Sequence, residues 1–169
     1  NTNQLTNVII PDSVTSIGKS AFSNNQLTRV IIPDSVTSIG IFAFRNNKIR
    51  DLKLPNTLVT IDAYAFSNNQ IESVVIPYGV TTVKEAAFGK NSLLSVEISD
   101  SVVTIGDNAF QYRVNITSVH LPNGIVSIGN RAFYSCRNLS SVNLPDGLAN
   151  IGNNAFNRCG ALDSITIPS

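Results

Sequence analysis

One apolar pattern returns along the whole chain at intervals of 22 or 23 residues. Successive units open at Leu5, Leu27, Ile49, Ile71, Leu93, Ile116, Leu139 and Leu162. All seven prolines close a segment of the form Leu-x-x-Val-x-Ile-Pro, and an Ala-Phe pair follows at a constant distance in all but the last unit. Units this short bury their apolar faces only by stacking on one another. The repeat therefore predicts one solenoid domain over residues 1–169, with seven full repeats and a partial eighth.

The first part of each unit has the two-residue period of a strand. Val8 and Ile10 alternate with Ile9, so the two sides of the segment differ. Pro11 then removes a backbone donor, which should end the ladder of hydrogen bonds. Because every unit runs in the same direction, neighbouring strands must be parallel, and parallel crossovers are right-handed in nearly all proteins. We therefore expect a right-handed coil with a parallel sheet.

The second part of each unit supplies a different shape. Val14 and Ile17 form another apolar pair, and glycine follows at Gly18 and at the same place in four later units, which indicates close approach or an unusual dihedral angle. The Ala-Phe pair comes three residues later and suits one or two short helical turns. The expected fold class is thus an α/β repeat solenoid.

The charge and hydropathy pattern excludes several function classes. Lys and Arg number 12 against 11 Asp and Glu, a net charge of +1, and they form no basic stripe of the kind that nucleic-acid binders carry. No apolar run reaches the length of about 18 residues that a membrane helix needs. We expect neither a nucleic-acid partner nor a membrane span.

The sequence contains no set of residues in a pattern typical of catalysis. His120 is the only histidine, and no serine, cysteine or carboxylate stands at a spacing that indicates a triad. No phosphate-binding loop, metal-ligand cluster or nucleophile motif is present. We expect a protein that is not an enzyme and that uses no metal or other cofactor.

The two ends of the chain differ from those of a complete solenoid. No methionine occurs, even at position 1, and the last residue, Ser169, stops inside a repeat. These features predict a piece excised from a larger protein. Solenoids normally end in polar capping units, and neither end has one, so we also expect possible end-to-end self-association.

The pattern Leu-x-x-Val-x-Ile-Pro followed by Ile-Gly-x-x-Ala-Phe resembles the BspA-type leucine-rich repeat family over residues 5–168. The resemblance implies a leucine-rich-repeat fold and a secreted or cell-surface protein. It also implies a role in adhesion, with a host or microbial surface protein as the partner, or a module within a larger secreted protein. A spacer or accessory array attached to a catalytic domain elsewhere in the parent protein is the alternative.

Units of this family often carry cysteine three residues after the phenylalanine. Cys136 and Cys159 fill that slot here, while four earlier units have asparagine: Asn25, Asn47, Asn69 and Asn91. The asparagines indicate either local hydrogen bonds to loop backbone or a polar ligand strip, and we favour the first. The two cysteines lie one repeat apart, so a disulfide is conceivable. A column of buried free thiols is favoured, because side chains in register point the same way.

Binding is expected on the concave face of the sheet, at the positions between the consensus apolar residues. An apolar strip rimmed by charge is typical of a protein-binding patch, although β-branched residues are also simply good strand formers. The candidate binding residues are Ile9, Arg29, Ile31, Arg50, Asp51, Lys53, Glu72, Val75, Glu97 and His120.

Overall fold

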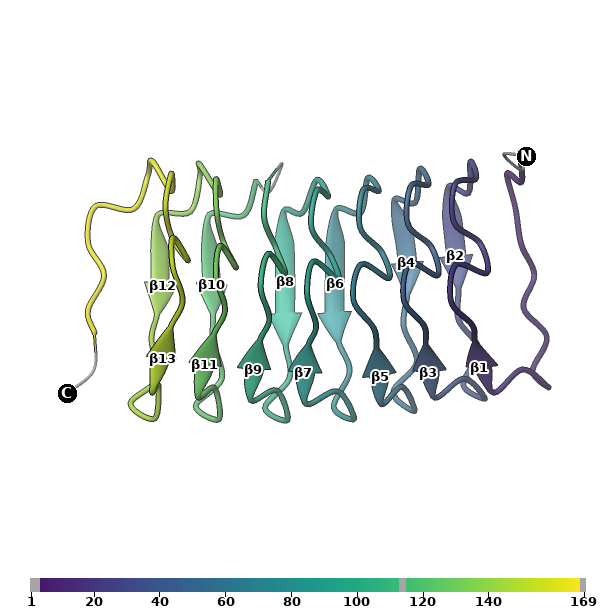
Figure 1. The fold of residues 1–169 in the computed structure, drawn as a ribbon, viewed down its shortest axis with the longest axis horizontal. Coiled ribbons are helices and arrows are strands. Elements are labelled where there is room, and N and C mark those ends of the chain that lie inside the picture. Colours follow the sequence, from purple (N-terminus) through teal and green to yellow (C-terminus); the bar gives the residue numbers. More distant parts are fainter. Residues whose placement is uncertain (1–3, 113–114, 168–169) are drawn as a thin grey trace.

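The computed structural model describes residues 4–112 and 115–167, and these form a coil with two rows of short strands (Figure 1). Pro168, which closes the eighth unit, lies outside the described residues. The first row holds the even-numbered strands, β2 (Arg29–Ile31), β4 (Asp51–Lys53), β6 (Ser73–Ile76), β8 (Ser95–Ile98), β10 (Ser118–His120) and β12 (Ser141–Asn143). The second row holds the odd-numbered strands, β1 (Ser16–Ile17), β3 (Ser38–Ile39), β5 (Thr60–Ile61), β7 (Thr82–Val83), β9 (Thr104–Ile105), β11 (Ser127–Ile128) and β13 (Asn150–Ile151).

Every strand pair in the structure is parallel and in register with the repeat. Val30 in β2 lies opposite Leu52 in β4, and Ile17 in β1 lies opposite Ile39 in β3. In Figure 1 the chain ascends along the nearer odd-numbered strands, crosses over and descends along the more distant even-numbered ones as it advances toward the C-terminus. The coil is therefore right-handed, and the expected solenoid with parallel strands is confirmed.

The Ala-Phe segments form turns, and no helix occurs among the described residues. The prediction of short helical turns was therefore wrong. The backbone takes a left-handed conformation twice in the first unit, at Ser20 (φ 57°) and Asn24 (φ 56°), and this breaks a right-handed helix. The freed amide groups pair with the next coil instead, as when Phe22 N donates to the main-chain oxygen of Ala43 at 2.8 Å.

A column of phenylalanine rings fills the interior between the two rows. Phe44 and Phe66 stack with ring centroids 5.3 Å apart and planes 2° apart, and the series continues from Phe22 to Phe156. The rings at the middle of the coil are fully buried, whereas Phe22 and Phe156 at its ends are half-buried. Large aromatic side chains at one repeat position thus supply a continuous core, because each ring covers the face of the one before it.

The recurring glycine marks a close approach between coils. A side-chain carbon added to Gly106 would lie 2.7 Å from the main-chain oxygen of Val83, and Gly106 N donates to that oxygen at 2.7 Å. No glycine in the structure has a positive φ. Of the two reasons expected for this glycine, close packing is therefore confirmed.

Candidate functional site

The outward side chains of the even-numbered strands form what we call the even-strand face, the side expected to be concave. All the predicted binding residues lie exposed on this face or at its margin. The most exposed large apolar side chain described is Ile9, at 85%, and Ile31 is 50% exposed. Ile31 lies in β2 between the buried residues Val30 and Ile32, so strand alternation directs it to solvent. Ile9 occupies the same repeat position between the half-buried Val8 and Ile10, but the strand expected there is absent from the structure.

A groove of about 480 Å³ crosses one end of the even-strand face. It is lined by four of the predicted residues, Ile9, Arg29, Ile31 and Lys53. Ile31 in β2 lies directly opposite Lys53 in β4. The groove therefore places apolar surface beside a cation within two neighbouring coils.

Carboxylates and prolines complete the groove. Asp34 follows Pro33 at the turn after β2, Asp12 follows Pro11 at the same place in the first unit, and both residues line the groove. Proline ends the ladder at this point, so the chain turns away and exposes the next side chain. The groove consequently carries both signs of charge around an apolar centre.

The charges beside the groove are only partly paired. Arg29 Nε lies 2.9 Å from Asp51 Oδ2 in an exposed ion pair, and Arg50 Nε donates to Gln70 Oε1 at 2.9 Å. Such exposed pairs stabilise a fold by roughly 0–1 kcal/mol, so they cost little to rearrange on binding. Within the described part of the chain, Lys53 has no ion-pair partner, which leaves its ammonium group available.

The other predicted residues lie farther along the face and outside the groove. Val75 in β6 is opposite Glu97 in β8, and His120 in β10 is opposite Asn143 in β12. Glu72 immediately precedes β6. In residues 4–112 and 115–167 no group of three His, Cys, Asp or Glu side chains is placed to hold a metal ion.

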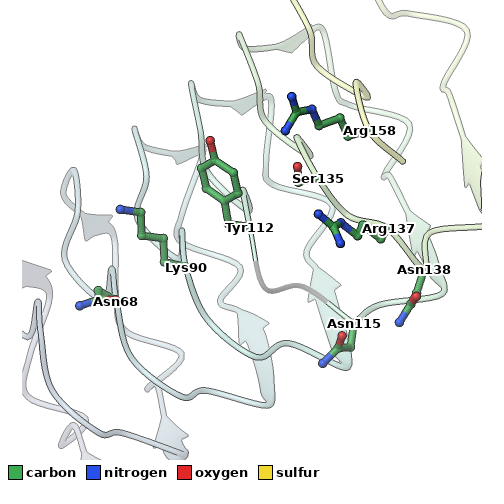
Figure 2. A pocket seen from close by; sticks show the side chains of 8 residues that line it. All are labelled: Asn68, Lys90, Tyr112, Asn115, Ser135, Arg137, Asn138 and Arg158. Carbon is green, nitrogen blue, oxygen red and sulfur yellow. The ribbon is translucent and has the colours of Figure 1, made fainter. Parts of the chain in front are cut away.

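A second hollow, of about 700 Å³, lies on the turns that follow the Ala-Phe pairs, and we call it the basic pocket (Figure 2). Its lining residues are Asn68, Lys90, Tyr112, Asn115, Ser135, Arg137, Asn138 and Arg158. This pocket was not predicted from the sequence, because its cations form no continuous basic stripe along the chain. The change of residue type at one repeat position along the chain was the signal that could have predicted the basic pocket.

That repeat position is the second left-handed residue of each unit. Early units place asparagine there, and Asn46 Nδ2 donates to Asn24 Oδ1 at 2.7 Å while Asn68 Nδ2 donates to Asn46 Oδ1 at 2.9 Å. Later units replace the amide with Lys90, Tyr112, Ser135 and Arg158, all at φ values between 58° and 63°. The asparagine series thus ends where the basic pocket begins.

The buried asparagine column is structural, as favoured from the sequence. Asn47 Nδ2 donates to the main-chain oxygen of Phe22 at 2.8 Å and to that of Phe44 at 3.0 Å, while its Oδ1 accepts from Leu27 N at 3.1 Å. Each such amide forms hydrogen bonds with backbone groups of two coils that are buried away from water. These buried side chains therefore cannot form a strip that binds a polar ligand.

Cysteine replaces part of this arrangement in the later units. The thiols of Cys136 and Cys159 are buried and free, and their sulfur atoms lie 3.6 Å and 3.3 Å from the main-chain oxygens of Phe110 and Phe133. Free thiols, the favoured alternative, are thus what the structure shows. The hydrogen bond with Cys159, together with burial, holds the pKa of the Cys136 thiol far above its usual range.

The chain is similar to a known family of repeat proteins. A family model described as BspA type leucine rich repeat region matches it in 6 copies over residues 1–116 and 103–169. No curated protein gives a significant match. In the part of the chain that the structure describes, no helix has the length and apolar character needed to cross a bilayer.

Several solved structures of leucine-rich repeat proteins are similar to this chain. The leucine-rich repeat protein TpLRR of T. pallidum is 30% identical over 88% of this chain and 72% of its own, with a TM-score of 0.79. The pneumococcal vaccine antigen PcpA is 21% identical over 92% of this chain and 43% of its own, with a TM-score of 0.65. A leucine-rich repeat protein from Bacteroides ovatus is 21% identical over 94% of this chain, with a TM-score of 0.47, and the present chain spans 65% of it.

Proposed function

This chain belongs to the BspA-type leucine-rich repeat family, and from that premise we propose that it is a non-enzymatic protein-interaction and adhesion module of a secreted or cell-surface protein. It binds a host or microbial surface protein through the even-strand face. Leucine-rich repeats are a rigid scaffold, so a partner meets a surface that is already ordered and loses little entropy on docking.

The observation that supports this proposal is the groove around Ile31. Exposed apolar side chains at Ile9 and Ile31 stand beside the cations Arg29 and Lys53 in one hollow. Contiguous apolar surface rimmed by charge marks protein-binding sites, because the apolar centre supplies affinity and the rim supplies orientation. The same strand position holds Lys53, Val75, Glu97 and His120 in the following units, so two exposed isoleucines in neighbouring units occur only at this end of the described face.

The test replaces Ile31 and Lys53 together with alanine. The wild-type chain and the double variant are immobilised and exposed to a panel of purified extracellular-matrix proteins and to whole bacterial cells. For any protein that the wild type binds, we expect at least about a tenfold loss of affinity in the double variant, since central interface residues commonly contribute 1 kcal/mol or more each, at about 1.4 kcal/mol per factor of ten.

A matched control changes one aliphatic side chain and one lysine away from the even-strand face. Val59→Ala with Lys19→Ala removes the same charge and a branched aliphatic side chain one methyl group smaller from exposed positions outside the groove. Binding should survive in this variant. Unchanged binding in the Ile31→Ala and Lys53→Ala double variant, with both proteins folded, contradicts the assignment of the even-strand face.

A spacer or accessory array beside a catalytic domain is the second candidate. The observation that supports it is that this chain spans only 43% of the longer PcpA structure. A scaffold of this kind holds neighbouring domains apart without a ligand of its own. Failure of the wild-type chain to bind any member of the panel favours this alternative.

A further inference from the structure

We propose that the basic pocket is a second binding site, one that takes the anionic groups of an acidic polysaccharide. Lys90, Arg137 and Arg158 contribute three cationic groups to one hollow, and none of the described residues that line it carries a carboxylate (Figure 2). The whole chain has nearly equal numbers of acidic and basic residues, with a net charge of +1. The basic pocket therefore has a local positive electrostatic potential, although the chain as a whole is nearly neutral.

The cations of the basic pocket are free to meet a ligand. All three side chains belong to exposed residues, and in residues 4–112 and 115–167 none of them makes an ion pair. Arg158 is held over the ring of Tyr134, with its guanidinium carbon 5.5 Å from the ring centroid. Stacking of this kind fixes the guanidinium plane while leaving its N–H groups able to donate to an anion.

The spacing of the cations suits a ligand with repeated negative charges. Lys90 belongs to the fourth unit, Arg137 to the sixth and Arg158 to the seventh. Coils in a parallel ladder follow one another at about 4.8 Å, so these groups span roughly 14 Å along the axis. A polymer lying along the coil would meet successive cations, whereas a single small anion would meet one or two.

The neutral groups of the basic pocket favour a saccharide over other anions. Asn68, Asn115 and Asn138 bring amides that both donate and accept hydrogen bonds, and Ser135 adds a hydroxyl. Such groups match the hydroxyls of a sugar ring, and the exposed ring of Tyr112 offers a flat apolar surface for its C–H face. A membrane surface would instead require several exposed apolar side chains beside the cations, and among the described residues of the lining Tyr112 is the one large side chain of that kind.

Binding is measured by calorimetry with three oligosaccharides of equal length. They are a sulfated heparin-derived fragment, an oligogalacturonate and a neutral maltooligosaccharide. We expect the wild-type chain to bind at least one of the two acidic probes and to ignore the neutral one, with affinity that falls as salt is added. Comparison of the sulfated and carboxylated probes identifies which anionic group the site prefers.

The variant Arg137→Ala with Arg158→Ala tests the site itself. Hydrogen bonds to charged groups are among the strongest, so we expect the affinity for the acidic probe to fall about tenfold or more. The control Lys19→Ala with Lys48→Ala lowers the net charge equally at exposed positions in the first two units, and it should bind like the wild type. If circular dichroism shows that the double alanine variant is unfolded, the double variant Arg137→Gln with Arg158→Gln is used instead.

Three results overturn the proposal. One is an equal loss in the control variant, which indicates attraction to net charge alone. Another is equal binding of the neutral oligosaccharide, and the third is tighter binding of a single-stranded DNA probe than of either acidic saccharide. The Ile31→Ala and Lys53→Ala variant should keep its saccharide binding, so failure of this site and failure of the even-strand face are separate outcomes.

Discussion

The side-chain amide of Asn69 donates a hydrogen bond to the main-chain oxygen of Phe44 at 2.9 Å, although 25 residues separate them. The same amide donates to Phe66 O at 3.0 Å, and its oxygen accepts from Ile49 N at 3.1 Å. All these atoms are buried. One side chain thus links two neighbouring coils and also stabilises the turn of its own coil. This explains why asparagine recurs at this position.

Asn69→Ala should therefore be strongly destabilising. It leaves buried backbone donors and acceptors without partners, and we expect the free energy of unfolding to fall by roughly 2–4 kcal/mol in urea titration. Asn69→Cys should lose less, because a thiol can still approach Phe44 O as Cys136 approaches Phe110 O at 3.6 Å. Asn56→Ala, at an exposed turn, is the control and should change little. Equal effects of Asn69→Ala and Asn56→Ala contradict the role given to this column.

Gly106→Ala and Gly18→Ala form a matched pair. A methyl group at Gly106 would meet the main-chain oxygen of Val83 at 2.7 Å, whereas at Gly18 it meets nothing within 4 Å. Forcing neighbouring coils apart costs about 1–3 kcal/mol, so Gly106→Ala should lower the midpoint of thermal unfolding clearly. Gly18→Ala should leave that midpoint unchanged or raise it slightly. Similar midpoints for the two variants would argue against close packing as the reason for this glycine.

The thiols of Cys136 and Cys159 should resist labelling in the folded protein. Burial shields both sulfur atoms, and the raised pKa of Cys136 keeps its thiol protonated at about pH 8, near the ordinary thiol pKa of about 8.5. A disulfide-exchange reagent should react slowly with the native chain and label two thiols once urea unfolds it. Detection of no free thiol in the unfolded chain would indicate a disulfide instead.

The same pKa shift predicts a pH dependence of stability. A thiol whose pKa is higher in the folded state binds its proton more tightly there, so its stabilising contribution is complete below the unfolded pKa. The hydrogen bond with Cys136 lowers the pKa of Cys159, but once Cys159 is ionised the buried neighbouring thiol resists losing its own proton. The unfolded chain loses both protons, so the free energy of unfolding should fall as the pH rises above about 8.5. Cys136→Ala should flatten this alkaline slope in urea titrations, and an identical slope in the variant speaks against the assignment.

Self-association through the ends of the coil remains a prediction. Within the described chain the outer edge of β13 has no paired strand, and Ile151 on that strand is 40% exposed. Unpaired edges and open apolar layers promote stacking of solenoids. Sedimentation of the 169-residue chain should show concentration-dependent association that Ile151→Lys weakens. A single monomeric species at high concentration in both proteins excludes it.

The repeat allowed much of the fold to be predicted, because its signal depends on spacing alone. Phe44 and Phe66 had to stack once units 22 residues apart were placed in register, and Ile31 had to face solvent once Val30 faced the core. The shape of the turns was not predictable in the same way. Residues such as Phe42 and Tyr64, at φ 61° and 59°, occupy left-handed positions that their side chains do not favour, and only pairing with the next coil holds them there.

The periodicity of the apolar residues is enough to predict the solenoid, its parallel register and the identity of the inward-facing side chains. The tertiary structure alone decided which surface residues share a site. Lys90, Arg137 and Arg158 are far apart in the chain and line one pocket only because stacking places their turns side by side. The groove around Ile31 and Lys53 likewise depends on how two coils leave the ends of their strands. Local patterns specify each turn of the coil, whereas a binding surface depends on distances between turns.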